Sequence, residues 1–279
     1  MSLSRIKIVT DAVVNATQWP NDIVTVIDLP IIINGQVYSH ISKISNAKYL
    51  SLLQRSSTSP KIGTVSVEEL ITLYDQLGAD GSKILSLHLS DRFTDTYSVA
   101  RQAAVQSLAD VTVVNSGVPA AGLSYQIQTA VNLIQANASF ATVIAQIRHT
   151  LENTRVYLSI SDNSQLVAQH RISWFRAIVE NRANVKYLMR FKDNDFQFIE
   201  RTTNDDYVSD FWRNQIQKMH ELNIASLDII HTGDSHRAHR IYDLMDQEFP
   251  LMPIHLRTAN PEMANYLGQN ATGVTYLLG

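Results

Sequence analysis

The sequence predicts an α/β protein of two domains, and three observations support this fold class. Short runs of apolar, β-branched residues alternate with longer amphipathic segments in the first half of the chain. This alternation is typical of a mostly parallel sheet with helices on both faces. The second half contains a predicted antiparallel hairpin, which indicates a mixed sheet. With 279 residues, of which 45% are hydrophobic and 18% charged, the chain can bury a core in each domain.

The first half contains the strands of the predicted parallel sheet. Asn34-Gly35 lies between two apolar runs and predicts a hairpin over residues 31–38. The buried strands of the sheet are predicted over residues 6–9, 23–27, 84–89 and 111–114.

Helices are predicted between these strands. Ser66 and Glu69 have the spacing of a capping box, and apolar residues follow them at helical intervals. Further helices are predicted over residues 94–108, 119–136 and 139–152.

The pattern changes near residue 153. Asp193-Asn194-Asp195 separates two strand-like runs, which predicts an antiparallel hairpin over residues 185–202. We therefore expect an N-terminal domain over residues 1–153 and a C-terminal domain with a mixed sheet over residues 154–279. The remaining elements of the second domain are strands over 156–160, 227–231, 252–256 and 274–277 and helices over 207–222 and 235–249.

Composition excludes several classes of function. A net charge of -3 gives no basic field for a phosphate backbone, so nucleic acid is not an expected partner. The absence of cysteine excludes disulfides, thiolate metal sites and cysteine nucleophiles. The most apolar stretch, residues 23–33, is shorter than the ~20 residues of a membrane-spanning helix, and no signal peptide is recognisable. We expect a cytoplasmic protein that does not span a membrane.

The sequence carries none of the common catalytic motifs, such as a phosphate-binding loop, a nucleophile elbow or a His-Glu-x-x-His zinc motif. We therefore expect no enzyme activity and no cofactor. One polar cluster, residues 231–240, contains His231, Asp234, His236 and His239 at a predicted helix start. It is compatible with a metal site, with an anion site strengthened by nearby arginines, or with a solvated helix start capped by Asp234. We expect no bound metal there.

Several segments, in the right order along nearly the whole chain, resemble the DegV family. They include Thr10-Asp11, the 29–38 hairpin, Pro60-Lys61 followed by Ser66, and Leu87-His88-Leu89-Ser90. The likeness continues with residues 111–116, Thr154-Arg155-Val156-Tyr157 and Arg171-Ile172-Ser173.

This resemblance implies two α/β domains of the DegV type that bind a fatty acid or related acyl lipid in a pocket between them. The carboxylate would be held by loops of the N-terminal domain, and the acyl tail would enter the C-terminal domain. Some family members present the fatty acid to a separate fatty acid kinase, and the binding protein itself supplies no catalytic group.

The resemblance also assigns the candidate ligand-binding residues and shows where this chain departs from the family pattern. A family threonine and serine are replaced by Ile62 and Gly63, and the serines after the first aspartate by Ala12 and Val13. Asp91 replaces a further serine, and Asn270 stands at a family histidine. The candidate residues are Ile62, Gly63, Thr64, Ser90, Asp91, Arg92, Thr94 and Asn270.

These departures leave two interpretations open. Asp91 would repel an acyl carboxylate about 4 Å away by roughly 4 kcal/mol at an effective dielectric constant of 20, unless it caps the next helix and faces away. In the first interpretation a reduced head-group site uses Ser90, Thr64 and Thr94. In the second the chain is a diverged paralogue that binds another apolar ligand or a protein partner, with the carboxylate site lost.

Overall fold

The computed structural model describes residues 5–11, 19–38, 44–56, 60–119, 121–161 and 185–279. The chain forms two compact units. Unit 1 comprises Met1–Ile44 and Pro60–Glu152, and unit 2 comprises Ser45–Ser59 and Asn153–Gly279. A single boundary near residue 153, as expected from the sequence, therefore does not account for residues 45–59, which lie in unit 2.

Unit 1 is built on a four-stranded parallel sheet of order β2-β1-β6-β7. From β1 the chain continues to the neighbour on one side, β2, whereas from β6 it continues to the neighbour on the other side, β7. The strand order therefore reverses between β1 and β6, and such a topological switch point is the usual ligand position in open parallel sheets. The strands, all predicted from the sequence, are β1 (Ile6–Asp11), β2 (Val24–Ile27), β6 (Lys83–His88) and β7 (Val111–Asn115).

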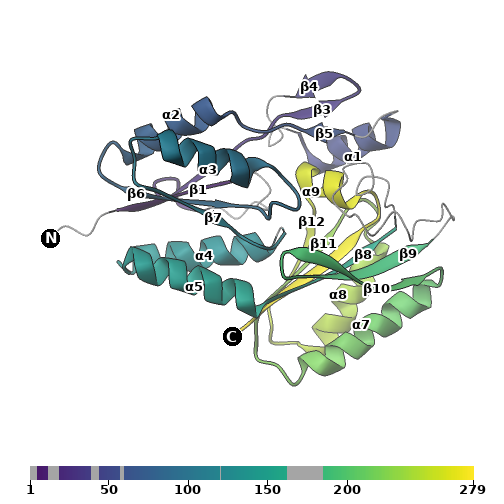
Figure 1. The fold of residues 1–279 in the computed structure, drawn as a ribbon. Helices are drawn as coiled ribbons and strands as arrows, with labels where there is room; N and C mark the ends of the chain where they lie inside the picture. Colours follow the sequence, from purple (N-terminus) through teal and green to yellow (C-terminus); the bar gives the residue numbers. More distant parts are fainter. Residues whose placement is uncertain (1–4, 12–18, 39–43, 57–59, 120, 162–184) are drawn as a thin grey trace. The chain divides into compact units, whose positions relative to one another are not determined.

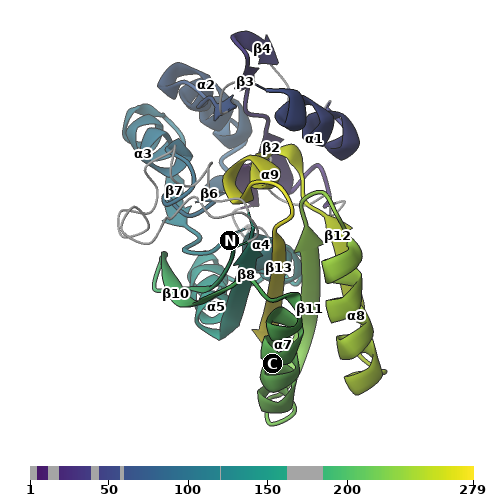
Figure 2. The same ribbon diagram turned by 90° about the vertical axis from the view of Figure 1, so that its right-hand side faces the viewer.

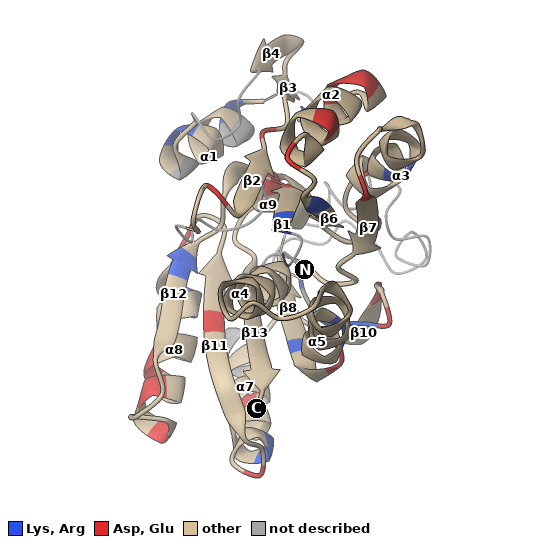
Figure 3. Ribbon diagram, turned by 90° about the vertical axis from the view of Figure 1, so that its left-hand side faces the viewer, with Lys and Arg blue, Asp and Glu red and all other residues tan. Residues whose placement is uncertain are grey.

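Helices cover both faces of this sheet. Figure 1 shows α2 (Val67–Gly78) and α3 (Thr96–Gln106) on one face, and α4 (Ala121–Gln135) and α5 (Phe140–Asn153) on the other. Apolar side chains of α2 and α3 pack on those of β1 and β6. Helix α4 has no charged residue (Figure 3), as expected for a helix with much of its surface buried.

The capping box predicted at the start of α2 is present. The Ser66 hydroxyl accepts a hydrogen bond from the Glu69 backbone N–H at 3.1 Å, and the Glu69 carboxylate accepts one from the Ser66 N–H at 2.8 Å. Two backbone donors that the helix leaves unsatisfied are thereby used. This cap fixes the helix that carries Tyr74, which lies in the candidate site below.

A small antiparallel sheet of order β4-β3-β5 completes unit 1, with β3 (Ile31–Ile33), β4 (Gln36–Tyr38) and β5 (Lys61–Ile62). Asn34 and Gly35 connect β3 to β4 with φ angles of 50° and 78°. Two consecutive left-handed residues are the geometry of a type I′ turn, so the predicted hairpin is confirmed.

Unit 2 is built on a six-stranded mixed sheet of order β10-β9-β8-β13-β11-β12. Only the β11–β12 pair is parallel among these described strands. The predicted hairpin over residues 185–202 is present, and its turn residues Asp193 and Asn194 both have positive φ. The strands are β8 (Thr154–Ile160), β9 (Lys186–Lys192), β10 (Asp195–Thr202), β11 (Ile224–His231), β12 (Ile254–Thr258) and β13 (Thr272–Leu278).

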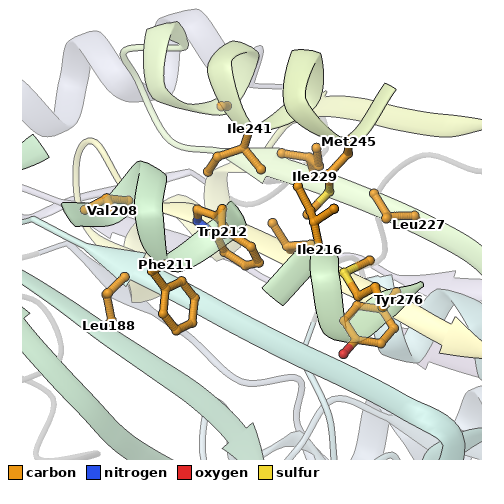
Figure 4. Packing of buried hydrophobic residues seen from close by; sticks show 13 residues of the cluster. Leu188, Val208, Phe211, Trp212, Ile216, Leu227, Ile229, Ile241, Met245 and Tyr276 are labelled. Atoms are coloured by element: carbon orange, nitrogen blue, oxygen red, sulfur yellow. The ribbon is translucent and has the colours of Figure 1, made fainter. Parts of the chain in front are cut away.

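Helices α7 (Asp205–Met219) and α8 (His236–Glu248) lie along one face of this sheet (Figure 2). Their apolar sides meet the strands in a core centred on Trp212, which is completely buried (Figure 4). Phe211 and Tyr157 pack edge-on against the Trp212 ring, with ring centroids 5.2 and 5.9 Å away. Aromatic packing of this kind contributes beyond the buried area alone.

Two helices of unit 2 lie outside the predicted set: α1 (Asn46–Arg55) and α9 (Pro261–Leu267). They contact each other, and the Tyr49 hydroxyl donates a buried hydrogen bond of 3.0 Å to Asn265 Oδ1. Helix α9 has a recognisable start, because Asn260 accepts the Met263 N–H at 2.9 Å and Pro261 occupies the first turn. No helix in the described part of the chain combines the length and apolarity needed to cross a bilayer.

Candidate functional site

The carboxyl ends of β1 and β6 separate at the switch point of unit 1. The β1–β2 pairing extends to Asp11 opposite Ile27, and the β6–β7 pairing extends to His88 opposite Asn115. Between β1 and β6, in contrast, the pairing ends earlier, at Val9 opposite Ser86. The two central strands therefore end without backbone pairing between them, which leaves side chains and loop amides to join them.

A chain of buried polar side chains joins them. One Asp11 oxygen bonds to His88 Nδ1, and the other accepts the Leu89 backbone N–H at 2.9 Å. His88 Nε2 lies 2.6 Å from the Ser86 hydroxyl, which lies 2.6 Å from the Tyr74 hydroxyl of α2. All four side chains have no exposed surface. We call Asp11, His88, Ser86 and Tyr74 the buried relay.

One arrangement of protons satisfies every group of the buried relay. The Tyr74 hydroxyl donates to Ser86, the Ser86 hydroxyl donates to His88 Nε2, and His88 Nδ1–H donates to the Asp11 carboxylate. Burial raises the pKa of the Tyr74 hydroxyl to about 12, against a smaller lowering by its hydrogen bond with Ser86. Tyr74 therefore stays protonated at neutral pH and acts as the donor that ends the relay.

Asp11, His88 and Ser86 have the hydrogen-bond order of a hydrolase triad, but their surroundings do not suit that chemistry. A serine nucleophile must reach a substrate carbonyl. Ser86 is completely buried, and its hydroxyl is bonded to both His88 and Tyr74. The arrangement is that of a satisfied polar network inside a core, which favours a structural role.

The loop after β6 carries buried hydroxyl groups. Ser90 and Thr94, both predicted site residues, are buried, and Thr94 Oγ1 lies 2.8 Å from Thr96 Oγ1. Asp91 and Arg92, in contrast, are exposed. The idea that Asp91 caps the next helix is wrong, because α3 begins at Thr96 and its cap position is Asp95. The main chain folds back within Ser90–Phe93, which puts this pair of charged residues on the surface.

The other predicted loop of unit 1 follows strand β5. Ile62 is half-buried and lies opposite Ile31, and Gly63 donates its N–H to the Pro30 carbonyl at 2.8 Å. Thr64 is exposed. The two replaced family positions thus lie in and just after a short strand. Ala12, Val13 and Arg171–Ser173, which also contribute to the resemblance, lie outside the described residues.

Thr10 is a further candidate, which was not among the site residues predicted from the sequence. Its hydroxyl, near the end of β1, is fully buried and has no hydrogen-bond partner among the described residues. A buried donor without a partner destabilises a fold by about 1–3 kcal/mol, so a ligand that accepts this bond is a natural explanation. The strand-end position was a usable signal, since ligands of parallel sheets bind at carboxyl ends.

Asn270, the predicted site residue of unit 2, lies beside the polar cluster at the start of α8. Its side-chain oxygen accepts the Asp234 N–H at 3.1 Å, and its carbonyl accepts a hydrogen bond from Arg237 at 3.2 Å. Asn270 has a φ of 58°, a left-handed conformation that asparagine tolerates. Asn270 and the histidine cluster, which lie apart in the sequence, are therefore adjacent within unit 2.

Two histidine side chains of this cluster are bonded to backbone carbonyls. His231 Nδ1 lies 3.2 Å from the Gly233 carbonyl, and His239 Nδ1 lies 2.9 Å from the Ser235 carbonyl. Burial lowers the pKa of His231. The cap position of α8 is Ser235 and not Asp234 as considered above, although Asp234 accepts the His236 N–H at 2.9 Å. Within the described residues, no group of three or more His, Cys, Asp or Glu side chains could hold a metal ion.

Comparison with known proteins decides the family. A family model described as "Uncharacterised protein, DegV family" matches residues 5–278. The chain belongs to the DegV family. This DegV protein is 26% identical over 276 residues to a DegV domain-containing protein of Streptococcus pneumoniae, with 98% of each chain covered.

Solved structures of other DegV proteins share the fold. One is a fatty acid binding DegV family protein from Streptococcus agalactiae, with a TM-score of 0.87, 19% identity and 98% and 99% of the two chains covered. Another is DegV, a fatty acid binding protein from Bacillus subtilis, with a TM-score of 0.85, 18% identity and 99% and 100% covered. The predicted family and fold class are confirmed.

Proposed function

We propose that this DegV protein binds a fatty acid or a related acyl lipid without catalysing a reaction, and that the head group binds at the carboxyl ends of β1 and β6. The observation that carries the proposal is the buried Thr10 hydroxyl at this switch point, for which the described part of the chain offers no hydrogen-bond partner. The buried hydroxyls of Ser90 and Thr94 follow β6 at the same edge of the sheet. Hydroxyl donors are the groups that a carboxylate needs when it leaves water.

Family membership supports the class of ligand, since related DegV structures are described as fatty acid binding proteins. The remaining candidates, Ile62, Gly63, Thr64, Asp91, Arg92 and Asn270, are proposed as contacts of the same ligand. Three expectations from the sequence stay predictions: that the lipid lies between the two domains, that a fatty acid kinase is a partner, and that the protein is cytoplasmic. A diverged ligand preference is the second candidate, because Ile62 lacks the hydroxyl that the family pattern has there.

Calorimetric titration of delipidated protein with palmitic acid tests the proposal. Thr10→Val replaces the hydroxyl with a methyl group of similar size, and we expect it to weaken binding about tenfold or more, since a hydrogen bond to a charged group contributes about 1.5–3 kcal/mol. Because the lost hydroxyl has no partner within the described protein, the same variant should be at least as stable as the wild type. Thr112→Val, the same change within β7 of the same sheet, is the matched control and should bind normally.

The outcomes separate the two candidates. Wild-type protein that does not bind palmitic acid but binds palmityl alcohol would favour the diverged ligand preference. Protein that binds neither would overturn the proposal. Unchanged palmitic acid binding by Thr10→Val would place the head group away from β1.

A further inference from the structure

The Asp11 carboxylate replaces the missing backbone pairing between β1 and β6. Beyond Val9 and Ser86 these strands are no longer paired, yet Asp11 reaches from β1 to two groups at the end of β6. It bonds to the His88 imidazole and to the Leu89 N–H. Leu89 is the first residue after β6, so this carboxylate determines where the following loop begins.

His88 holds that carboxylate in its orientation. Its Nδ1 bonds to Asp11, while its Nε2 is anchored through Ser86 to Tyr74. Because each side chain is fully buried, none of these bonds has water as a substitute partner. The imidazole is therefore held by hydrogen bonds at both nitrogens. Because its Nδ1 has a fixed position, it favours a single rotamer of the Asp11 side chain.

The position of Leu89 also determines the position of the loop that begins at Ser90. Ser90 comes next, and its carbonyl accepts the Phe93 N–H at 2.9 Å while its hydroxyl accepts the Arg92 N–H at 3.2 Å. These two bonds close a tight turn that begins directly after Leu89, so we expect a displacement of Leu89 to displace the Ser90 hydroxyl with it.

We propose that His88 is a positioning residue for ligand binding: it orients Asp11, which fixes Leu89 and thereby the Ser90 loop at the head-group site. The inference rests on the proposed function for its ligand, but the loop positioning can be measured without one. His88 touches no ligand in this role.

Two substitutions of His88 separate positioning from general stability. In His88→Asn the amide nitrogen lies near the place of Nδ1 and can still donate to Asp11. In His88→Gln the amide reaches the place of Nε2 and can bond to Ser86, whereas Asp11 loses its imidazole partner. Each variant removes one bond of the buried relay, so both should lose some stability. Only His88→Gln removes the bond that orients Asp11, so under the positioning role only this variant should change the Leu89 amide and ligand binding.

Hydrogen exchange of the Leu89 amide and titration with palmitic acid are the measurements. We expect His88→Asn to resemble the wild type in both, and His88→Gln to show about tenfold faster exchange and about tenfold weaker binding, the effect of losing one hydrogen bond to a charged group. Thr112→Val on neighbouring β7 is the control and should show wild-type exchange. If His88→Gln does not fold, Asp11→Asn replaces it, because this change substitutes a donor for one of the two acceptor oxygens.

Equal exchange rates in the two His88 variants would overturn the positioning role, whatever the lipid result. If exchange differs as expected but wild-type protein binds no palmitic acid, the proposed function fails and the link to ligand binding fails with it.

Discussion

Gly63 lies directly against Pro30: a Cβ atom added at Gly63 would come within 2.7 Å of Pro30 Cγ. The Gly63 N–H also donates to the Pro30 carbonyl, so the loop cannot move away without losing that bond. The family serine expected at this position therefore does not fit here unless the proline shifts. We predict that Gly63→Ser lowers the free energy of unfolding by about 1–3 kcal/mol, as overpacking does, and gains no palmitic acid affinity. Urea denaturation and calorimetry check both parts, and a fully stable variant would contradict the first.

Substitution of Ile62, unlike that of Gly63, should add a hydroxyl donor for the ligand carboxylate without overpacking the loop. Threonine is also β-branched and suits strand β5, so Ile62→Thr should keep the pairing with Ile31. Its new hydroxyl should tighten palmitic acid binding about tenfold, whereas palmityl alcohol, which carries no charge, should gain less. Calorimetry with both ligands measures the difference. An equal gain for the two ligands would show that the hydroxyl does not meet a carboxylate.

The capping box of α2 should give a measurable pH dependence. The hydrogen bonds from Ser66 hold the pKa of Glu69 below its ordinary value. A lowered carboxylate pKa stabilises the fold above about pH 5, and this contribution is lost as the pH falls through the folded-state value. We expect Ser66→Ala to cost about 1 kcal/mol at neutral pH and less in acid. Unfolding free energies measured across this range, with Thr64→Ala as the control, test it.

Substitutions of Trp212 should show how far the stability of the unit 2 core depends on the size of this ring. Its indole N–H is buried without a hydrogen-bond partner among the described residues, so Trp212→Phe removes an unsatisfied donor together with part of the ring. We expect Trp212→Ala to cost about 3–5 kcal/mol of unfolding free energy and Trp212→Phe clearly less. Chemical denaturation measures the unfolding free energies of the two variants. Equal losses of unfolding free energy would contradict the prediction, because they would mean that a phenyl ring stabilises the core no better than a methyl group.

The protonation of His231 should make the stability of the fold depend on pH near neutrality. Because burial lowers its pKa, the unfolded chain binds a proton more readily than the folded one. Stability should therefore fall as the pH drops below about 6.5, the ordinary histidine value, and level off once the folded-state pKa is passed. The wild type should lose more stability over this window than His231→Gln. Parallel pH dependences of the two proteins would contradict this prediction.

Local patterns predicted most of the elements. Ser66 with Glu69 and Asn34 with Gly35 are short-range signals, and the structure uses both as expected. Helix α1 was missed because its stability comes from distant contacts, as the bond between Tyr49 and Asn265 shows. The buried relay was missed for a related reason. Asp11 and His88 are polar residues within apolar strands, and only the pairing of those strands brings them together.

The placement of α1 in unit 2 affects how the chain folds during synthesis and which fragments of it can be complete units. Tyr49 and Asn265 are 216 positions apart in the chain, so the ribosome completes α1 long before its partner α9 exists. Unit 2 is also discontinuous, and a fragment beginning at Asn153 would lack the helix that packs on α9. No single proteolytic cut can therefore release both units whole. A split protein made from the two halves should regain a complete unit 2 only when the N-terminal piece is supplied as well.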